Sequence, residues 1–181
     1  MRVSVFGGSS PKPEEIAYED AYRLGKLLGE EGYIVLNGGY VGTMEAVSRG
    51  AVEAGGRVIG VTCDQIEAWR PVAPNVWIQE KMHFVTLRER LNALIDNCDA
   101  ALVLPGGIGT LAELAAMWSQ LQTGAITPKR LILIGSDWED VMHLFMDKFD
   151  DYVPEMYRPL LEYADSVDHA IDMLKTNQMN N

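Results

Sequence analysis

Ala100-Ala101-Leu102-Val103-Leu104 runs directly into Pro105-Gly106-Gly107-Ile108-Gly109-Thr110. The first five residues are all apolar, which is typical of a central parallel strand that is covered on both faces. The Gly-rich turn ends this strand, and a helix is predicted over residues 110–122. The stretch therefore predicts one strand–turn–helix unit of a parallel α/β sheet.

The rest of the chain repeats this alternation of strand and helix without a break in composition. We expect a single domain over residues 1–175, a Rossmann-like, doubly wound parallel α/β sheet. Residues 62–75 are predicted to be irregular, and residues 176–181 to form a polar tail. The predicted strands are 2–6, 33–36, 57–61, 76–79, 100–104 and 131–134, with a short segment near Tyr163. The predicted helices are 13–31, 43–54, 86–97, 110–122, 138–149 and 166–174.

The composition limits the classes of partner. The 181-residue chain has a formal net charge of −11, and a field of that sign repels nucleic acid and anionic membranes. Cys63 and Cys98 are expected to be buried thiols of a cytoplasmic protein. No apolar run approaches membrane-spanning length, and the three histidines have no metal-ligand spacing. We therefore expect no membrane anchor, no metal and no cofactor.

Three Gly-rich turns follow predicted strands, at residues 7–10, 38–42 and 106–109. The carboxyl ends of parallel strands share one edge of the sheet, where ligands of such folds bind. Glycine lets the backbone approach a ligand closely, and the helix after each turn offers unpaired N–H groups to an anion. Neither longer turn contains Gly-Lys-Ser/Thr or Gly-x-Gly-x-x-Gly, so the turns favour a mononucleotide.

The residues expected to bind the nucleotide lie in these turns. A Gly-rich turn can also be a purely steric requirement, and for residues 38–42 taken alone both interpretations stay open. Trp69, Trp118 and Met44 could stack on a base, or pack in the core instead. The candidate binding residues are Gly8, Ser9, Gly38, Gly39, Gly42, Thr43, Met44, Gly106, Gly107, Ile108, Gly109 and Thr110.

Two charged residues near these turns are candidates for chemistry. Glu113 lies one helical turn beyond Gly109, so its carboxylate would sit at the mouth of the phosphate site. An acid near a helix start also interacts favourably with the helix dipole, which is the alternative explanation. Arg90 precedes the central strand on a predicted helix, and it could equally be a solvated cation like its neighbour Arg88. His83 could line the same pocket.

Residues 105–113, Pro-Gly-Gly-Ile-Gly-Thr-Leu-Ala-Glu, resemble the Pro-Gly-Gly-x-Gly-Thr-x-x-Glu signature of the LOG ("lonely guy") family. Residues 5–10 and 38–44 resemble the family's first and second turns, and the resemblance covers most of the chain. Members of this family are nucleoside 5′-monophosphate phosphoribohydrolases. The resemblance implies that Arg90, at the position of the family's catalytic arginine, and Glu113 are the catalytic residues.

The family pattern is broken at two positions. Leu91 stands where the family usually has Lys, and Ala112 stands where it usually has the first of two acids. Residues 42–51 look closer to molybdenum-cofactor carrier proteins of the same fold. We therefore expect this chain to share the family's fold and phosphate-binding turns more closely than its activity.

Two functions stay open for this sequence. The first is an enzyme that hydrolyses the N-glycosidic bond of an AMP-like nucleotide, giving the free base and ribose 5-phosphate. The second is a non-catalytic carrier or sensor of a phosphorylated ligand. The resemblance also implies a homodimer or a larger homo-oligomer. The candidate contact face consists of Met117, Trp118 and Leu121.

Overall fold

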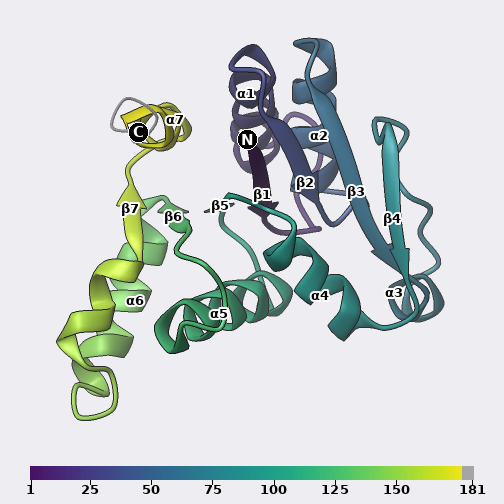
Figure 1. The fold of residues 1–181 in the computed structure, drawn as a ribbon. Helices are drawn as coiled ribbons and strands as arrows, with labels where there is room; N and C mark the ends of the chain where they lie inside the picture. The colour runs from purple at the N-terminus through teal and green to yellow at the C-terminus, as the bar shows by residue number, and fades with distance from the viewer. Residues whose placement is uncertain (177–181) are drawn as a thin grey trace.

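A seven-stranded parallel sheet forms the centre of the molecule (Figure 1). The structure is a computed structural model that describes residues 1–176. Neighbouring strands run parallel in the order β4-β3-β2-β1-β5-β6-β7. The predicted Rossmann-like, doubly wound α/β fold is confirmed. The strands are β1 (Arg2–Phe6), β2 (Ile34–Asn37), β3 (Arg57–Cys63), β4 (Glu80–Phe84), β5 (Ala100–Val103), β6 (Arg130–Ile134) and β7 (Glu162–Ala164).

Helices cover both faces of the sheet, which buries the apolar central strands on both sides. Figure 1 shows α4, α5 and α6 along the lower side of the sheet, opposite α1 and α7. The first face carries α1 (Ile16–Glu30), α2 (Thr43–Glu53) and α7 (Val167–Thr176). The second face carries α4 (Leu87–Asp96), α5 (Ile108–Thr123) and α6 (Ser136–Lys148). Short helices are α3 (Asp64–Trp69) and the 3-10 helix η1 (Glu155–Leu160).

The segment between β3 and α4 differs from its prediction. The strand predicted at residues 76–79 is wrong, because the fourth strand is β4, four residues later. Since β4 pairs with β3 alone, it is an edge strand and can expose polar side chains, whereas Val76 is 89% exposed outside any strand. Residues 64–69, predicted to be irregular, form α3.

Several element boundaries also move. The helix α5 begins at Ile108, two residues before the predicted start, because Gly107 is its N-cap. The helix α1 begins at Ile16, and the preceding Glu14 has a positive φ of 75°. Thr176, predicted to begin a polar tail, is the last residue of α7, and residues 177–181 of that tail lie outside the described residues.

Several residues singled out in the sequence lie in the two apolar layers on either side of the sheet. Cys63 and Cys98 are buried free thiols, as predicted. Met117 is fully buried and Trp118 is 8% exposed, both in the layer between the sheet and α4, α5 and α6. These two residues therefore cannot form the predicted contact face of a dimer. None of the described helices is long and apolar enough to cross a membrane.

The helices α1 and α2 pack unusually closely because glycines lie at their crossing. A Cβ added at Gly25 would lie 2.1 Å from the Val47 carbonyl oxygen, and one at Gly50 would lie 2.0 Å from the Tyr22 carbonyl oxygen. Both obstacles are backbone atoms, so a side chain could be accommodated only if the two helices moved apart. This packing fixes α2, whose N-terminus follows the second Gly-rich turn.

We expect Gly25→Ala to destabilise the protein by roughly 1–3 kcal/mol, the usual cost of overpacking a core. The measurement is the free energy of unfolding in denaturant. Lys26→Ala, at the next and exposed position of α1, is the control and should change it by less than about 0.5 kcal/mol. Equal stabilities of the two variants would contradict the close packing.

Candidate functional site

The reversal of strand order between β1 and β5 brings the Gly-rich turns together. From β1 the chain adds β2, β3 and β4 on one side, and from β5 it adds β6 and β7 on the other. The Gly8 N–H donates to the Pro105 carbonyl at 3.3 Å, which links the turns after β1 and β5. Both the N–H and the Oγ1 of Thr43 donate to the Gly8 carbonyl, which adds the turn after β2. The turns therefore meet at a topological switch point, where α/β sheets bind ligands.

A cleft of about 430 Å³ opens between these turns, α3 and the first turns of α4 and α5. This volume lies within the range of small-ligand sites. Ten of the residues predicted from the sequence line it together: Gly8, Ser9, Gly38, Met44, Gly107, Ile108, Gly109, Thr110, Arg90 and Glu113.

Four other predicted binding residues, Gly39, Gly42, Thr43 and Gly106, do not line the cleft. They hold the turns in shape. Gly42 has a φ of 73°, and a Cβ there would lie 2.6 Å from the Gly8 carbonyl oxygen. Gly106 leaves room for Thr110, whose Oγ1 would lie 2.1 Å from a Cβ at that position. Their glycine and threonine identities follow from packing between the turns.

The N-terminus of α5 opens into the cleft. Gly107 is the N-cap, no side chain caps this helix, and its first turn holds no acidic residue. The N–H groups of the first helical residues therefore have no partner within the helix, and the helix dipole adds partial positive charge. A Cβ at Gly107 or Gly109 would meet no atom within 4 Å, so the space beside this backbone is open. An anion can bind in that space.

Arg90 is carried into the cleft by α4. Thr86 and Glu89 form a reciprocal capping box at the start of this helix, which fixes where it begins. Arg90 is 5% exposed, and its Nε donates to the Val61 carbonyl at 2.8 Å. Arg88 on the same helix is exposed. The two arginines that the sequence could not separate therefore have different environments.

Arg90 and Glu113 form a buried ion pair in the cleft, with Nη1 3.3 Å from Oε1. Gly38 makes this position of Arg90 possible, because a Cβ there would lie 1.9 Å from Nη2. The guanidinium also lies over the Tyr40 ring, 5.8 Å from its centroid. Among the described residues, Arg90 is the one hydrogen-bond partner of the Glu113 side chain. The second carboxylate oxygen is thus available to water or a ligand.

Burial raises the pKa of Glu113 from its ordinary value of 4.5 to about 7, although Arg90 opposes this shift. The desolvation of the carboxylate outweighs a single, long contact with the guanidinium. A carboxyl group with a pKa near neutrality can accept or donate a proton at physiological pH, as a general acid or base must.

Two cleft residues that contact Arg90 or Ser9 were not identified from the sequence. Tyr40 lies against Arg90, and its hydroxyl accepts a hydrogen bond from the Cys63 N–H at 2.9 Å. Arg70 follows α3, in a segment predicted to be irregular, so no periodic pattern pointed to it. Trp69 also lines the cleft and is 78% exposed.

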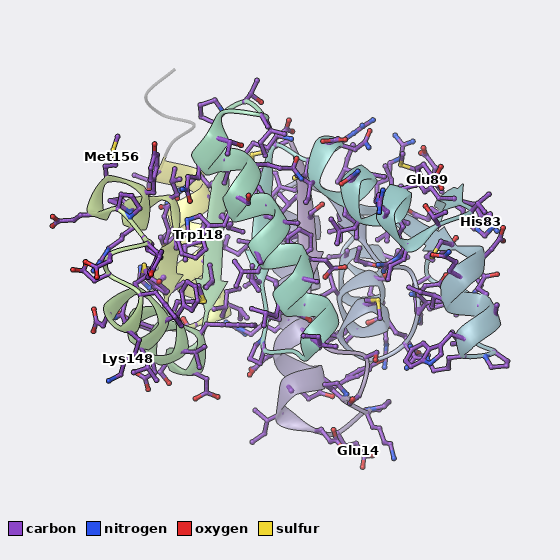
Figure 2. The ribbon with its side chains drawn as sticks, turned by 90° about the horizontal axis from the view of Figure 1, so that it is seen from below. Glu14, His83, Glu89, Trp118, Lys148 and Met156 are labelled. Carbon is purple, nitrogen blue, oxygen red and sulfur yellow. The ribbon has the colours of Figure 1, made fainter. Side chains whose placement is uncertain are left out.

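His83 does not line the cleft. Its ring nitrogens lie 2.8 Å from Thr62 Oγ1 and 2.8 Å from Asp64 Oδ1. Figure 2 shows it at the outer edge of the molecule, far from the α5 residue Trp118. In residues 1–176, no group of three or more His, Cys, Asp or Glu side chains is placed to hold a metal ion.

The fold and the cleft together define a Rossmann-like α/β protein whose switch point carries a cleft of the size of a small-molecule site. The model of the SLOG cluster4 family matches residues 1–142, and the chain belongs to this family of LOG type. A protein of Oryza sativa subsp. japonica named probable cytokinin riboside 5′-monophosphate phosphoribohydrolase LOGL5 is 36% identical over 155 residues. That match covers 81% of this chain but 59% of the rice protein.

A second relative and a solved structure extend this comparison. The cytokinin riboside 5′-monophosphate phosphoribohydrolase of Mycobacterium tuberculosis is 33% identical over 137 residues, 75% of this chain and 71% of its own length. The molybdenum cofactor binding protein of Rippkaea orientalis has a similar structure, with a TM-score of 0.75 and 25% identity. That similarity covers 97% of this chain and 95% of the other.

The pKa of Glu113 makes the stability of the protein depend on pH. Because the folded pKa is raised above 4.5, folding favours the protonated form; its contribution is fully present below pH 4.5 and is lost as pH rises to about 7. We expect the free energy of unfolding of wild type, relative to Glu113→Gln, to fall by roughly 3 kcal/mol across this interval. Denaturant unfolding at pH 4.5 and 7.5 measures the difference.

The glutamine variant is the matched control, because it keeps the shape of the protonated carboxyl group and does not titrate. Stability curves for the two proteins that stay parallel between pH 4.5 and 7.5 would show that Glu113 is not desolvated as the structure has it.

Proposed function

We propose that the protein hydrolyses the N-glycosidic bond of a nucleoside 5′-monophosphate of the AMP type. The observation that carries the proposal is the buried Arg90–Glu113 pair, in a cleft that also contains the open N-terminus of α5. The pair supplies a carboxyl group whose pKa is near neutrality, and the helix start supplies an anion site. A phosphorylated ribosyl substrate fits both groups, because its phosphate can occupy the anion site and its glycosidic bond can react at the carboxyl group.

The proposed reaction replaces the C1′–N bond by a C1′–O bond to water. As the bond to the base breaks, positive charge develops on the sugar ring, as in glycoside hydrolysis. The Glu113 carboxylate stabilises this charge and takes a proton from the attacking water. The base leaves with the electron pair of the broken bond and takes up a proton, which balances the proton that water gives to Glu113 once that carboxylate is regenerated. The products are the free base and ribose 5-phosphate.

Arg90 has two roles in this proposal. Its positive charge favours the ionised form of Glu113, which burial alone would disfavour more strongly. Its guanidinium is held by the Val61 carbonyl and by the Tyr40 ring, so it can orient the carboxylate and contact the leaving base or the sugar without reorganising. The backbone N–H groups of residues 107–110 would bind the 5′-phosphate.

The named relatives support this reaction class. The rice and mycobacterial proteins both carry the name of a phosphoribohydrolase that acts on a riboside 5′-monophosphate. The cytokinin base in those names is not carried over to this chain.

A carrier of a phosphorylated ligand is the second candidate function. The similarity to the molybdenum cofactor binding protein favours it, because that protein is named for binding a cofactor and not for a reaction. A carrier would need the anion site at α5 but not a proton-accepting carboxylate. Release of free base from nucleoside monophosphates, separated by chromatography, distinguishes the two functions.

We expect Glu113→Gln to lower kcat by about 100-fold or more, because it removes the charge that stabilises the transition state and the base that activates water. Arg90→Ala should also lose turnover, whereas Arg88→Ala, on the same helix but exposed, should keep it. Wild-type kcat/KM should rise with pH toward a plateau above about 7, where Glu113 is ionised.

The assay is release of adenine, guanine, cytosine or uracil from the respective 5′-monophosphates. If wild type binds a monophosphate and releases no base from any of the four, the carrier function is correct and the hydrolase is not. If Glu113→Gln retains wild-type turnover, the reaction does not depend on this carboxylate.

We also propose that the protein forms a homodimer in the cytoplasm, through the outer face of α6. Val141, Leu144, Phe145 and Phe149 are exposed there at helical spacing. A contiguous apolar face of this kind is typical of an interaction surface. We expect Leu144→Glu to be monomeric by light scattering at micromolar concentration, and Arg88→Glu on α4 to keep the wild-type state. A monomeric wild type would contradict the proposal.

A further inference from the structure

The cleft contains one charge that the proposed chemistry does not use. Three charged side chains line it, namely Arg90, Glu113 and Arg70. Arg90 is paired with Glu113, whose ionised form neutralises it. Within residues 1–176, no carboxylate lies within 4.0 Å of the Arg70 guanidinium. Arg70 therefore gives the cleft a net positive charge in a protein whose formal net charge is −11.

Arg70 is held in place rather than extended into solvent. Its N–H donates to the Ile66 carbonyl at 2.9 Å, which fixes the residue at the end of α3. Its guanidinium lies 5.7 Å from the centroid of the Trp69 ring. Its Nη1 donates to Ser9 Oγ at 3.2 Å, across the cleft, in the turn after β1. The side chain thus reaches from the end of α3 to the turn after β1, which lies next to the turn before α5.

One donor of this guanidinium is left without a partner. The Nε of Arg70 is buried and makes no hydrogen bond in the described part of the chain. A buried donor without an acceptor is costly, and that cost is greater for a charged group. The side chain also lines the cleft, where its outer N–H groups can form the stronger, charge-assisted type of hydrogen bond with an anionic acceptor.

The neighbouring groups indicate what kind of acceptor fits. Ser9 follows Gly8, and a Cβ at Gly8 would lie 3.4 Å from the Gly106 Cα, so Arg70 reaches the immediate surroundings of the turn that precedes α5. The unpaired N–H groups of α5 approach the same cleft from that side. A neutral base or a ribose hydroxyl needs no such charge, whereas a phosphate dianion does.

We propose that Arg70, oriented by Ser9 and Trp69, is the residue that makes the cleft select phosphorylated over unphosphorylated nucleosides. It binds the phosphate oxygens together with the N-terminus of α5. This inference rests on the proposed nucleotide ligand, and it adds the group that recognises the phosphate charge. It does not require that the protein hydrolyse the ligand.

The test is calorimetric titration of AMP and of adenosine into wild type, Arg70→Ala, Arg70→Lys and Arg88→Ala. Wild type should bind AMP more tightly than adenosine. Arg70→Ala should weaken AMP binding by about 10- to 100-fold, the range of a charge-assisted hydrogen bond, and leave adenosine binding within about twofold. Arg70→Lys should recover part of the loss, because it keeps the charge but not the planar guanidinium.

Arg88→Ala is the control for the loss of a surface charge and should bind both ligands as wild type does. Ribose 5-phosphate and inorganic phosphate, titrated in parallel, show whether the phosphate group alone is sufficient for the Arg70 effect. Thermal unfolding of each variant should match wild type, since Arg70 is partly exposed at the end of a short helix.

Three results would overturn the inference: an Arg70→Ala protein that binds AMP as wild type does, one that loses AMP and adenosine affinity equally, or a wild type that does not bind AMP more tightly than adenosine. Failure of the hydrolase is a separate outcome. A wild type that binds AMP through Arg70 but releases no adenine refutes the proposed reaction and leaves this inference standing. A working hydrolase whose KM for AMP is unchanged in Arg70→Ala refutes this inference alone.

Discussion

The pairing of β1 with β5 is the contact on which the site depends. The strand order reverses there, so the chain leaves the two strands toward helices on opposite faces of the sheet. A crevice at the carboxyl ends of such strands follows from the topology. What the sequence adds is glycine: the Gly8 N–H bonds Pro105, and Gly42 packs on the backbone of residues 8 and 9. The turns could not approach this closely with side chains between them.

The buried ion pair sets the chemistry of this crevice at a cost in stability. An ion pair in a poorly solvated place seldom stabilises a fold, because desolvation offsets its Coulomb energy. Here the single contact between Arg90 and Glu113 is long, at 3.3 Å, and the pKa of the carboxyl group rises to about 7. A tighter, two-point pair would lower that pKa and remove the proton-accepting ability. The geometry therefore favours reactivity over stability, which is common at functional sites.

The sequence predicts most of the fold, but only some of the residues that line the cleft. The buried strands and the Gly-rich turns have strong local patterns, so the sheet and its carboxyl edge could be derived. The edge strand β4 and the short helix α3 could not, since an exposed edge tolerates polar residues and a six-residue helix has no periodicity to read. Arg90 and Arg88 look alike in sequence, and burial by Val61 and Gly38 separates them only in three dimensions. Arg70 was missed because its importance comes from a contact with Ser9, 61 residues away.

The two departures from the family pattern cancel each other in charge. Leu91 replaces the family's usual Lys and Ala112 replaces one of its usual acids, and both residues line the cleft. A cation and an anion are thus lost together, so the net charge around Arg90 and Glu113 is the same as in the family pattern. Loss of the acid alone would leave an unpaired cation, and loss of the lysine alone would raise the pKa of the remaining carboxyl group further. Because both are absent together, the Arg90–Glu113 unit stays balanced, and Arg70 is the remaining charged side chain among the described residues that line the cleft.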